Sequence, residues 1–88
     1  MTSYTPSANK RENVKYYAHA VYEDLYPVNQ NDTFALGEFI SSVNLSQALL
    51  INDADGTEVA TSIALNVVTV TAVVSSIKCT LFAYGRSV

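Results

Sequence analysis

The feature of this sequence that most constrains its fold is an uncharged run of nineteen residues, Val59–Ile77, in which eleven residues are Val, Ile or Thr. β-branched residues fit the pleated, half-buried surface of a strand. A membrane span needs about 20 mostly apolar residues, and this run is interrupted too often by Thr61, Ser62, Asn66, Thr69, Thr71, Ser75 and Ser76. An uncharged, proline-free segment of high β-propensity aggregates when it is exposed. The run therefore predicts β-structure that is hidden in a sheet or against another chain.

The length and composition of the chain favour association with other subunits. Its 88 residues form one small domain, which buries only about 60–65% of the surface that the unfolded chain exposes. Apolar residues make up 49% of the chain and charged residues only 15%, against about 25% in an average protein. The surface then has few charged side chains to keep the molecule soluble as a monomer. We expect a homo-oligomer or a component of a larger assembly, and the alternative is a monomer with a surface rich in Ser, Thr and Asn.

Charge is distributed unevenly along the chain. The net charge of −3 argues against a nucleic-acid partner, because phosphates require a basic face. Lys10, Arg11 and Lys15 lie within the first fifteen residues, whereas acidic residues fill the middle of the sequence. A basic arm on an acidic body can dock onto an acidic partner, and the alternative is a solvated tail.

The first thirteen residues differ in composition from the rest of the chain. Residues 1–13 are polar, and they have too little apolar surface to offset the entropy of ordering them alone. They predict a flexible, extended N-terminal arm, followed by a single β-domain over residues 14–88. They also lack the apolar stretch that is typical of a signal peptide. We therefore expect the protein in a cytoplasm or in particles that are assembled there.

Alternation of side-chain character begins at Val14 and predicts the first strand, over residues 14–22. The inward face comprises Val14, Tyr16, Ala18, Ala20 and Tyr22, and the outward face comprises Lys15, Tyr17, His19, Val21 and Glu23. A helix is the alternative, because apolar residues between Val14 and Leu25 also follow helical spacing. The content of Tyr and Val favours the strand.

Five further strands are expected, over residues 33–40, 43–51, 57–65, 67–72 and 77–84. Asp55-Gly56 predicts a hairpin, because Asp and Gly accept the positive φ of a tight turn. Residues expected to share a face are Phe34 with Leu36; Val43 with Leu45, Gln47, Leu49 and Ile51, opposite Leu50; Val68 with Val70 and Ala72; and, facing inward, Ile77 with Cys79, Leu81 and Ala83. About six short strands without a helix predict an all-β fold, a small antiparallel β-sandwich or barrel with an extended N-terminal arm.

No constellation of catalytic, cofactor-binding or metal-binding residues is present in the sequence. Asp53-Ala54-Asp55-Gly56 resembles the start of a calcium-binding loop. In that register, Ile51 and Ser62 would occupy the first and last positions of the loop, where carboxylates are needed. His19 is the only histidine and Cys79 the only cysteine. Cys79 is expected to be a small buried apolar residue, without a disulfide. We expect no cofactor and no metal, and a protein that is not an enzyme.

The tyrosines are the strongest indication of a contact surface. Tyr combines a large rigid ring with a polar tip, and it is enriched at interfaces. Tyr16 and Tyr22 fall on the predicted core face, whereas the other aromatic residues near strands stand in water unless a partner covers them. The residues expected to contact a partner are Tyr4, Lys10, Arg11, Tyr17, Tyr26, Phe82 and Tyr84.

The segment from Asp55 to Thr71 resembles a known pattern. It is similar to the D-G-T-x-V-x-T-x-I-x-x-N-V-V-T-V-T runs of small virion structural proteins of tailed bacteriophages, capsid decoration (cement) proteins among them. The likeness extends over about residues 53–84. It implies a non-catalytic role in the virion, in which a small β-domain, often trimeric, binds the outer capsid lattice and clamps neighbouring major capsid subunits. No membrane or nucleic-acid partner is expected.

Two other functions remain open at this point. One is a tail, neck or fibre-associated structural module of a phage, which differs from a decoration protein only in its location. The other is a small cytoplasmic β-domain that binds a carbohydrate or another small ligand through exposed Tyr17, Tyr26 and Tyr84. A closed oligomer would favour the assembly functions over a monomeric binder.

Overall fold

The computed structural model describes residues 2–14, 17–37 and 40–87, and every regular element in these ranges is a β-strand. The strands are β1 (Ser3–Tyr4), β2 (Lys10–Val14), β3 (Tyr17–Val28), β4 (Thr33–Ala35), β5 (Ile40–Asn52), β6 (Glu58–Val59), β7 (Thr61–Ala64), β8 (Val67–Val70) and β9 (Ile77–Ser87). Within the same ranges, no helix is long and apolar enough to cross a membrane. The predicted all-β class is confirmed.

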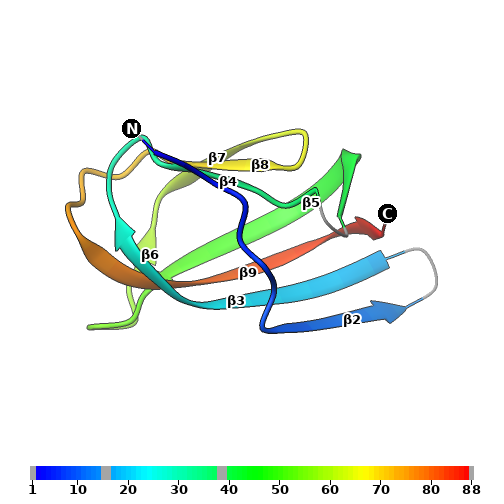
Figure 1. The fold of residues 1–88 in the computed structure, drawn as a ribbon, viewed down its shortest axis with the longest axis horizontal. Helices are drawn as coiled ribbons and strands as arrows, with labels where there is room; N and C mark the ends of the chain where they lie inside the picture. The colour runs from blue at the N-terminus through cyan, green and yellow to red at the C-terminus, as the bar shows by residue number, and fades with distance from the viewer. Residues whose placement is uncertain (1, 15–16, 38–39, 88) are drawn as a thin grey trace.

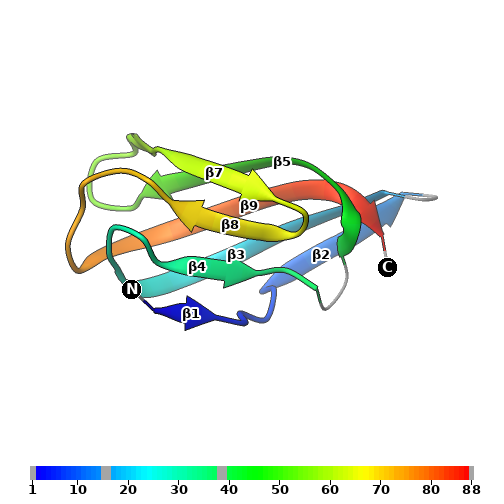
Figure 2. The same ribbon diagram turned by 90° about the horizontal axis from the view of Figure 1, so that it is seen from above.

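The strands form two sheets that face each other (Figure 1). One sheet has the strand order β1-β4-β8-β7, and the other has the order β2-β3-β9-β5-β6. Seen from above, the four-stranded sheet lies in front of the five-stranded sheet (Figure 2). Strand pairs are antiparallel, apart from β1 with β4. Of the two architectures expected from the sequence, the structure is the sandwich.

Side chains from both sheets fill the space between them. The buried apolar residues are Ala18, Ala20, Tyr22, Val28, Phe34, Leu36, Leu50, Val59, Val68, Val70, Cys79, Leu81 and Ala83. The register of β3 with β9 places Ala20 opposite Ala83 and Tyr22 opposite Leu81. The inward alternation predicted for β9 and for the described part of the first strand is therefore confirmed. The predictions for Val14, Tyr16, Val43 and Leu45 concern side chains outside the described part of the structure.

β5 buries the face that carries Leu50. Leu50 is fully buried opposite Leu81, whereas Leu49 is 38% exposed and lies opposite Phe82. Gln47, on the same face as Leu49, is also exposed. The longer alternating series predicted on this strand, which includes Gln47 and Leu49, is therefore not the core face. Cross-strand pairing with β9 decides which face is buried.

The hairpin predicted at Asp55-Gly56 is present. Asn52 donates its backbone N–H to the carbonyl of Thr57 at 2.9 Å, and Gly56 has a φ of 74°. The return segment is not one strand, however. It is divided into β6 and β7, which belong to different sheets, and the chain crosses between the sheets at Ala60. The carbonyl of Ala60 accepts hydrogen bonds from the backbone N–H groups of Thr71 and Ala72.

The predicted flexible N-terminal arm is not confirmed. β1 pairs with β4 in one sheet and β2 pairs with β3 in the other, so that the N-terminal segment contributes to both layers (Figure 2). Asp32 is buried, and its two carboxylate oxygens accept hydrogen bonds from the backbone N–H groups of Thr2 and Asn29, both at 2.9 Å. The low apolar content of the segment did not predict its structure correctly. Backbone hydrogen bonds to the edge strands β4 and β3 order the segment instead.

β3 is a strand, as predicted, and not the alternative helix, but it is longer than expected. The sequence predicts that this strand ends at Tyr22, whereas β3 continues to Val28. Its register with β9 shifts after Tyr22, and Asp24 there has a φ of 58°. An extra residue of this kind bends a strand without ending it. β9 likewise continues to Ser87, beyond the end at Tyr84 that the sequence predicts.

Candidate protein-binding surface

The outer face of the five-stranded sheet carries a cluster of exposed aromatic and apolar side chains. Residues directly opposite one another on adjacent strands share a face and contact each other. Two such rows cross β3, β9 and β5, namely Val21 with Phe82 and Leu49, and His19 with Tyr84 and Gln47. Tyr17, opposite Arg86, continues this face on β3. We call this surface the aromatic face, and its members are Tyr17, His19, Val21, Gln47, Leu49, Phe82 and Tyr84.

Tyr84 lies at the centre of the aromatic face. Its ring stacks on that of Tyr17 with a centroid distance of 5.6 Å and an interplanar angle of 5°. It also meets the His19 ring edge-on, at 4.6 Å and 75°. Both geometries are favoured by the charge distribution of aromatic rings. Tyr17 is nevertheless 47% exposed, Phe82 44% and Leu49 38%. The Tyr17 ring is therefore exposed to water while its stacking on Tyr84 holds it in one arrangement, and the Phe82 ring is exposed on the same face.

Two shallow hollows lie on this side of the sheet. One, of about 260 Å³, lies over β3, β9 and β5. The other, of about 540 Å³, lies toward β2, where Lys10, Arg11 and Glu12 line it, while His19 and Val21 line both hollows. The register places Lys10 opposite Val21 and Glu12 opposite His19. The apolar centre thus adjoins a charged margin, which is the usual anatomy of a protein interface.

The structure brings together four of the predicted contact residues. Tyr17, Phe82 and Tyr84 lie on the aromatic face, and Lys10 lies at its margin. Arg11 has the core-facing Ala20 as its cross-strand partner, so the register assigns it to the other side of β2, although Arg11 also lines the hollow toward β2. Lys10 and Arg11 thus both border this hollow, and the register places only Lys10 on the side of the aromatic face.

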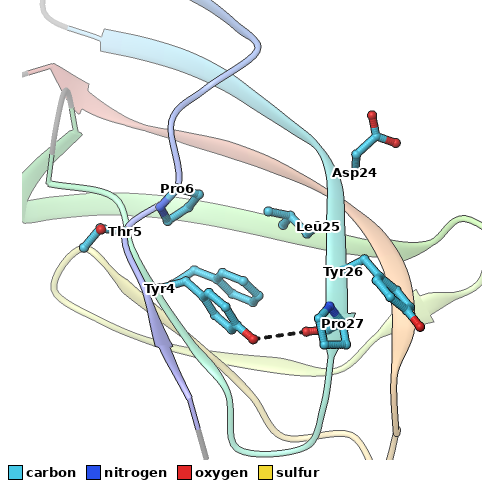
Figure 3. Close-up of a pocket in the computed structure, with 8 residues that line it drawn as sticks. Tyr4, Thr5, Pro6, Asp24, Leu25, Tyr26 and Pro27 are labelled. Atoms are coloured by element: carbon cyan, nitrogen blue, oxygen red, sulfur yellow. Dashed lines mark hydrogen bonds between the residues drawn. The ribbon is translucent and has the colours of Figure 1, made fainter.

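The other two predicted contact residues, Tyr4 and Tyr26, lie beside a separate hollow of about 210 Å³ (Figure 3). Tyr4 stacks on Phe34 at 5.4 Å, and its hydroxyl donates a hydrogen bond to the carbonyl of Pro27 at 3.3 Å. Tyr26 is 65% exposed, and its ring points away from Tyr4 (Figure 3). Tyr4 thus contributes to packing within the chain, and Tyr26 does not line either hollow of the aromatic face.

Four members of the aromatic face were not among the predicted contact residues. His19 and Val21 share the outward register of Tyr17, so the alternation along that strand is a signal that could have identified them. Gln47 and Leu49 join the face only because β5 pairs with β9. Alternation within one segment does not reveal a pairing between segments more than 30 residues apart.

The ionisable groups of the molecule provide little reactive chemistry. Burial, and to a smaller degree the charge of Asp53, raises the pKa of the Cys79 thiol to about 11. Lys78 and Asp24 form an exposed ion pair at 2.9 Å, and the hydrogen bond to Asp24 raises the pKa of Lys78. In the described ranges, no group of three His, Cys, Asp or Glu side chains could hold a metal ion. The aromatic face offers contact area and hydrogen bonds.

Comparisons with known proteins identify no relative of this chain, because no protein-family model, no curated protein and no solved structure matches it. The function is therefore argued from the aromatic face and its surroundings. The same comparisons leave the similarity to phage virion proteins as a sequence-based expectation.

Proposed function

We propose that this chain is a non-catalytic assembly protein that binds another protein through the aromatic face. The observation that carries the proposal is the exposure of Tyr17 and Phe82 on either side of Tyr84, where stacking on Tyr84 fixes the Tyr17 ring. Binding a partner then immobilises few additional side chains, and this lowers the entropic cost of association. Aromatic anchors inside a polar margin are where binding energy concentrates at protein interfaces.

The partner that we propose is a virion subunit, with the major capsid protein as the first choice. The support is the similarity of residues 55–71 to small phage structural proteins, together with the low charge content of 15%. The mechanism would be adhesive. Each contact would be modest, but many copies on a symmetric lattice would add avidity without any new contact. Lys10 and Glu12 at the margin would set the orientation of docking and make binding depend on salt.

The test is co-sedimentation of the purified protein with virus particles from the source of the sequence. Phe82→Ser removes an exposed anchor, and we expect it to weaken binding roughly tenfold or more. Tyr26→Ser is the matched control, because Tyr26 is also an exposed aromatic residue of the same sheet but lies beside a different hollow. Binding of the control should change by less than about twofold. Equal effects of the two substitutions would move the contact away from the aromatic face.

A second candidate function is the binding of a carbohydrate or another small ligand on the aromatic face. The observation that favours it is the combination of the Tyr84 ring with the polar side chains of His19 and Gln47 around one hollow. That hollow measures only about 260 Å³ and is shallow, whereas small-molecule sites are usually enclosed pockets of about 300–1,000 Å³. Titration with oligosaccharides, followed by NMR shifts of Tyr84 and Phe82, distinguishes the two functions.

A further inference from the structure

The strands at the ends of the two sheets differ in how well they are protected against pairing with another chain. β1 and β6 are two residues long, and β2 carries Lys10, Arg11 and Glu12. Short length and charge are both devices that keep sheet edges from pairing. β7 (Thr61–Ala64) has neither, because it is four residues long and lies within the uncharged run. Figure 2 shows β7 at the outer margin of the four-stranded sheet.

The hydrogen bonds of β8 show which backbone groups of β7 face this open edge. Val70 donates its N–H to the carbonyl of Asp32 and accepts a hydrogen bond from the N–H of Asn31, both at 2.8 Å. The backbone groups of Val70 therefore point away from Thr61, its cross-strand neighbour in β7. Bonded and non-bonded pairs alternate along an antiparallel ladder. The N–H and C=O groups of Thr61 and Ile63 consequently point outward, away from β8.

One apolar side chain at the same edge is only partly covered. Ile63 lies opposite Val68, which is fully buried, yet Ile63 itself is 40% exposed. Residues opposite each other share a face, so Ile63 belongs to the inner layer. β5 of the other sheet lies close to β7, but no strand of the described residues pairs with β7 on its outer side. Leu65, in the turn that follows β7, is 67% exposed. An added strand would cover Ile63 and take up the outward backbone groups together.

We propose that a second copy of this chain pairs with β7 in antiparallel orientation about a two-fold axis that passes between the two Ser62 residues. Thr61 of each copy would then lie opposite Ile63 of the other. Each of these two pairs exchanges two backbone hydrogen bonds, which gives about four in total. The side chains of Thr61 and Ile63 stay on the inner face in both copies, and the two four-stranded sheets become one continuous sheet.

The occupant that fits this edge best is a second copy, because the edge is complementary to itself. The outward residues, Thr61 and Ile63, flank Ser62 symmetrically, so one register satisfies both copies. Residues 59–77 carry no charge, and two like molecules, each with a net charge of −3, therefore meet where repulsion is weakest. β7 itself offers no charged side chain to a charged peptide. The inference is independent of the aromatic face, which lies on the other sheet.

The size of the contact sets the strength that we expect. Pairing of one four-residue strand buries less surface than the about 1,200–2,000 Å² of a standard stable interface. Dimerisation should therefore be weak in dilute solution and become evident at high concentration or within a larger assembly. A two-fold contact of this kind closes after two copies, so that a trimer requires a different interface.

Disulfide cross-linking tests the register. In the proposed pairing the two Ser62 Cα atoms form a non-hydrogen-bonded pair about 4.5 Å apart, which lies within the range for disulfides. Ser62→Cys should therefore give a disulfide-linked dimer on non-reducing gels. Ala64→Cys is the matched control, because it is exposed on the same strand, but its two copies would be offset by four residues, about 13 Å. Equal cross-linking of both variants, or none of Ser62→Cys, would overturn the proposal.

Sedimentation equilibrium of the intact chain tests the association itself. The wild-type protein should show a concentration-dependent monomer–dimer equilibrium. Ile63→Lys should weaken it at least tenfold, because a charge at an edge opposes pairing. Gln30→Lys, in an exposed turn, adds the same charge and should change the dissociation constant by less than about twofold. A wild-type monomer at all concentrations, a trimer, or an unaffected Ile63→Lys dimer would refute the inference. If Ile63→Lys fails to fold, the cysteine pair still decides.

Discussion

The buried carboxylate of Asp32 accepts a hydrogen bond from the backbone N–H of Thr2, thirty residues earlier in the chain. Its second oxygen accepts one from the N–H of Asn29 at the start of the same turn. One side chain therefore joins the N-terminus to the turn between β3 and β4. The backbone continues the connection, because the N–H of Thr33 donates to the carbonyl of Thr2 at 2.9 Å. Asp32 thus fixes the segment that carries β1.

We expect Asp32→Ala to lower the free energy of unfolding by about 2–3 kcal/mol. The substitution leaves two backbone N–H groups without their charged acceptor, and hydrogen bonds to charged groups contribute about 1.5–3 kcal/mol. Urea denaturation measures the change. Asp53→Ala is the control, because exposed Asp53 accepts a hydrogen bond from the Thr80 hydroxyl at 2.8 Å, and we expect it to cost less than about 1 kcal/mol. Equal losses would mean that Asp32 is not the anchor of the N-terminus.

Tyr4 should stabilise the fold through its ring and not through its hydroxyl. The ring stacks on Phe34, which is buried, whereas the hydroxyl makes one long, exposed hydrogen bond of 3.3 Å to Pro27. Tyr4→Ala should therefore cost about 2 kcal/mol, by exposing Phe34 and removing an aromatic pair. Tyr4→Phe should change the stability by less than about 0.5 kcal/mol. Thermal unfolding of both variants checks this, and a destabilised Tyr4→Phe protein would contradict it.

Local patterns in the sequence predicted those features of the fold that depend only on residues close to one another in the chain. Period-two alternation identified the core face of β9, with Cys79 and Leu81, and Asp55-Gly56 identified a hairpin. Long-range pairing decided the rest. No local pattern distinguishes the buried Leu50 from the exposed Leu49, and the crossing between sheets at Ala60 interrupts a segment that looks like one strand.

The candidate site was likewise predicted only in part. Tyr17, Phe82 and Tyr84 were identified as outward-facing because alternation places them on the side of their strands opposite to the core residues. Their assembly into one surface depends on the pairing of β9 with both β3 and β5, and sequence reasoning did not predict this pairing. Tyr4 was assigned to a partner because its segment was expected to be flexible. The structure shows the Tyr4 ring stacked on Phe34 within the same chain, and a contact of Tyr4 with a partner stays a prediction.

The turn between β7 and β8 contains a strained leucine. Leu65 has a φ of 56° and is 67% exposed, and a bulky residue in the left-handed region costs on the order of 1 kcal/mol. Asn adopts this conformation readily. Leu65→Asn should therefore stabilise the fold by about 1 kcal/mol and raise Tm by about 4–8 °C in a domain of this size. Leu65→Ala keeps the strain and should bring no such gain, so equal Tm values for the two variants would count against strain as the cause.

The Cys79 thiol should be unreactive in the folded protein. It is fully buried in the sandwich, and burial raises its pKa to about 11. At pH 8 almost no thiolate forms, and the thiolate is the nucleophile. Dithionitrobenzoate should therefore label Cys79 slowly in buffer and rapidly in denaturant. Rapid labelling without denaturant would show that the core opens frequently near β9.

The same burial should make stability depend on pH in the alkaline range. The pKa of Cys79 rises from an ordinary value of 9.0 to about 11 on folding, so between these values the folded protein binds more protons than the unfolded chain. The free energy of unfolding must then fall as the pH rises from about 9 to 11, by an amount on the order of 2 kcal/mol. Below pH 9 this contribution is constant.

Cys79→Ala removes the titrating group while Lys and Tyr side chains still titrate, so the difference between the two proteins isolates the thiol. Urea midpoints measured from pH 8 to 11 should fall more steeply for the wild type, and parallel curves would contradict the assignment.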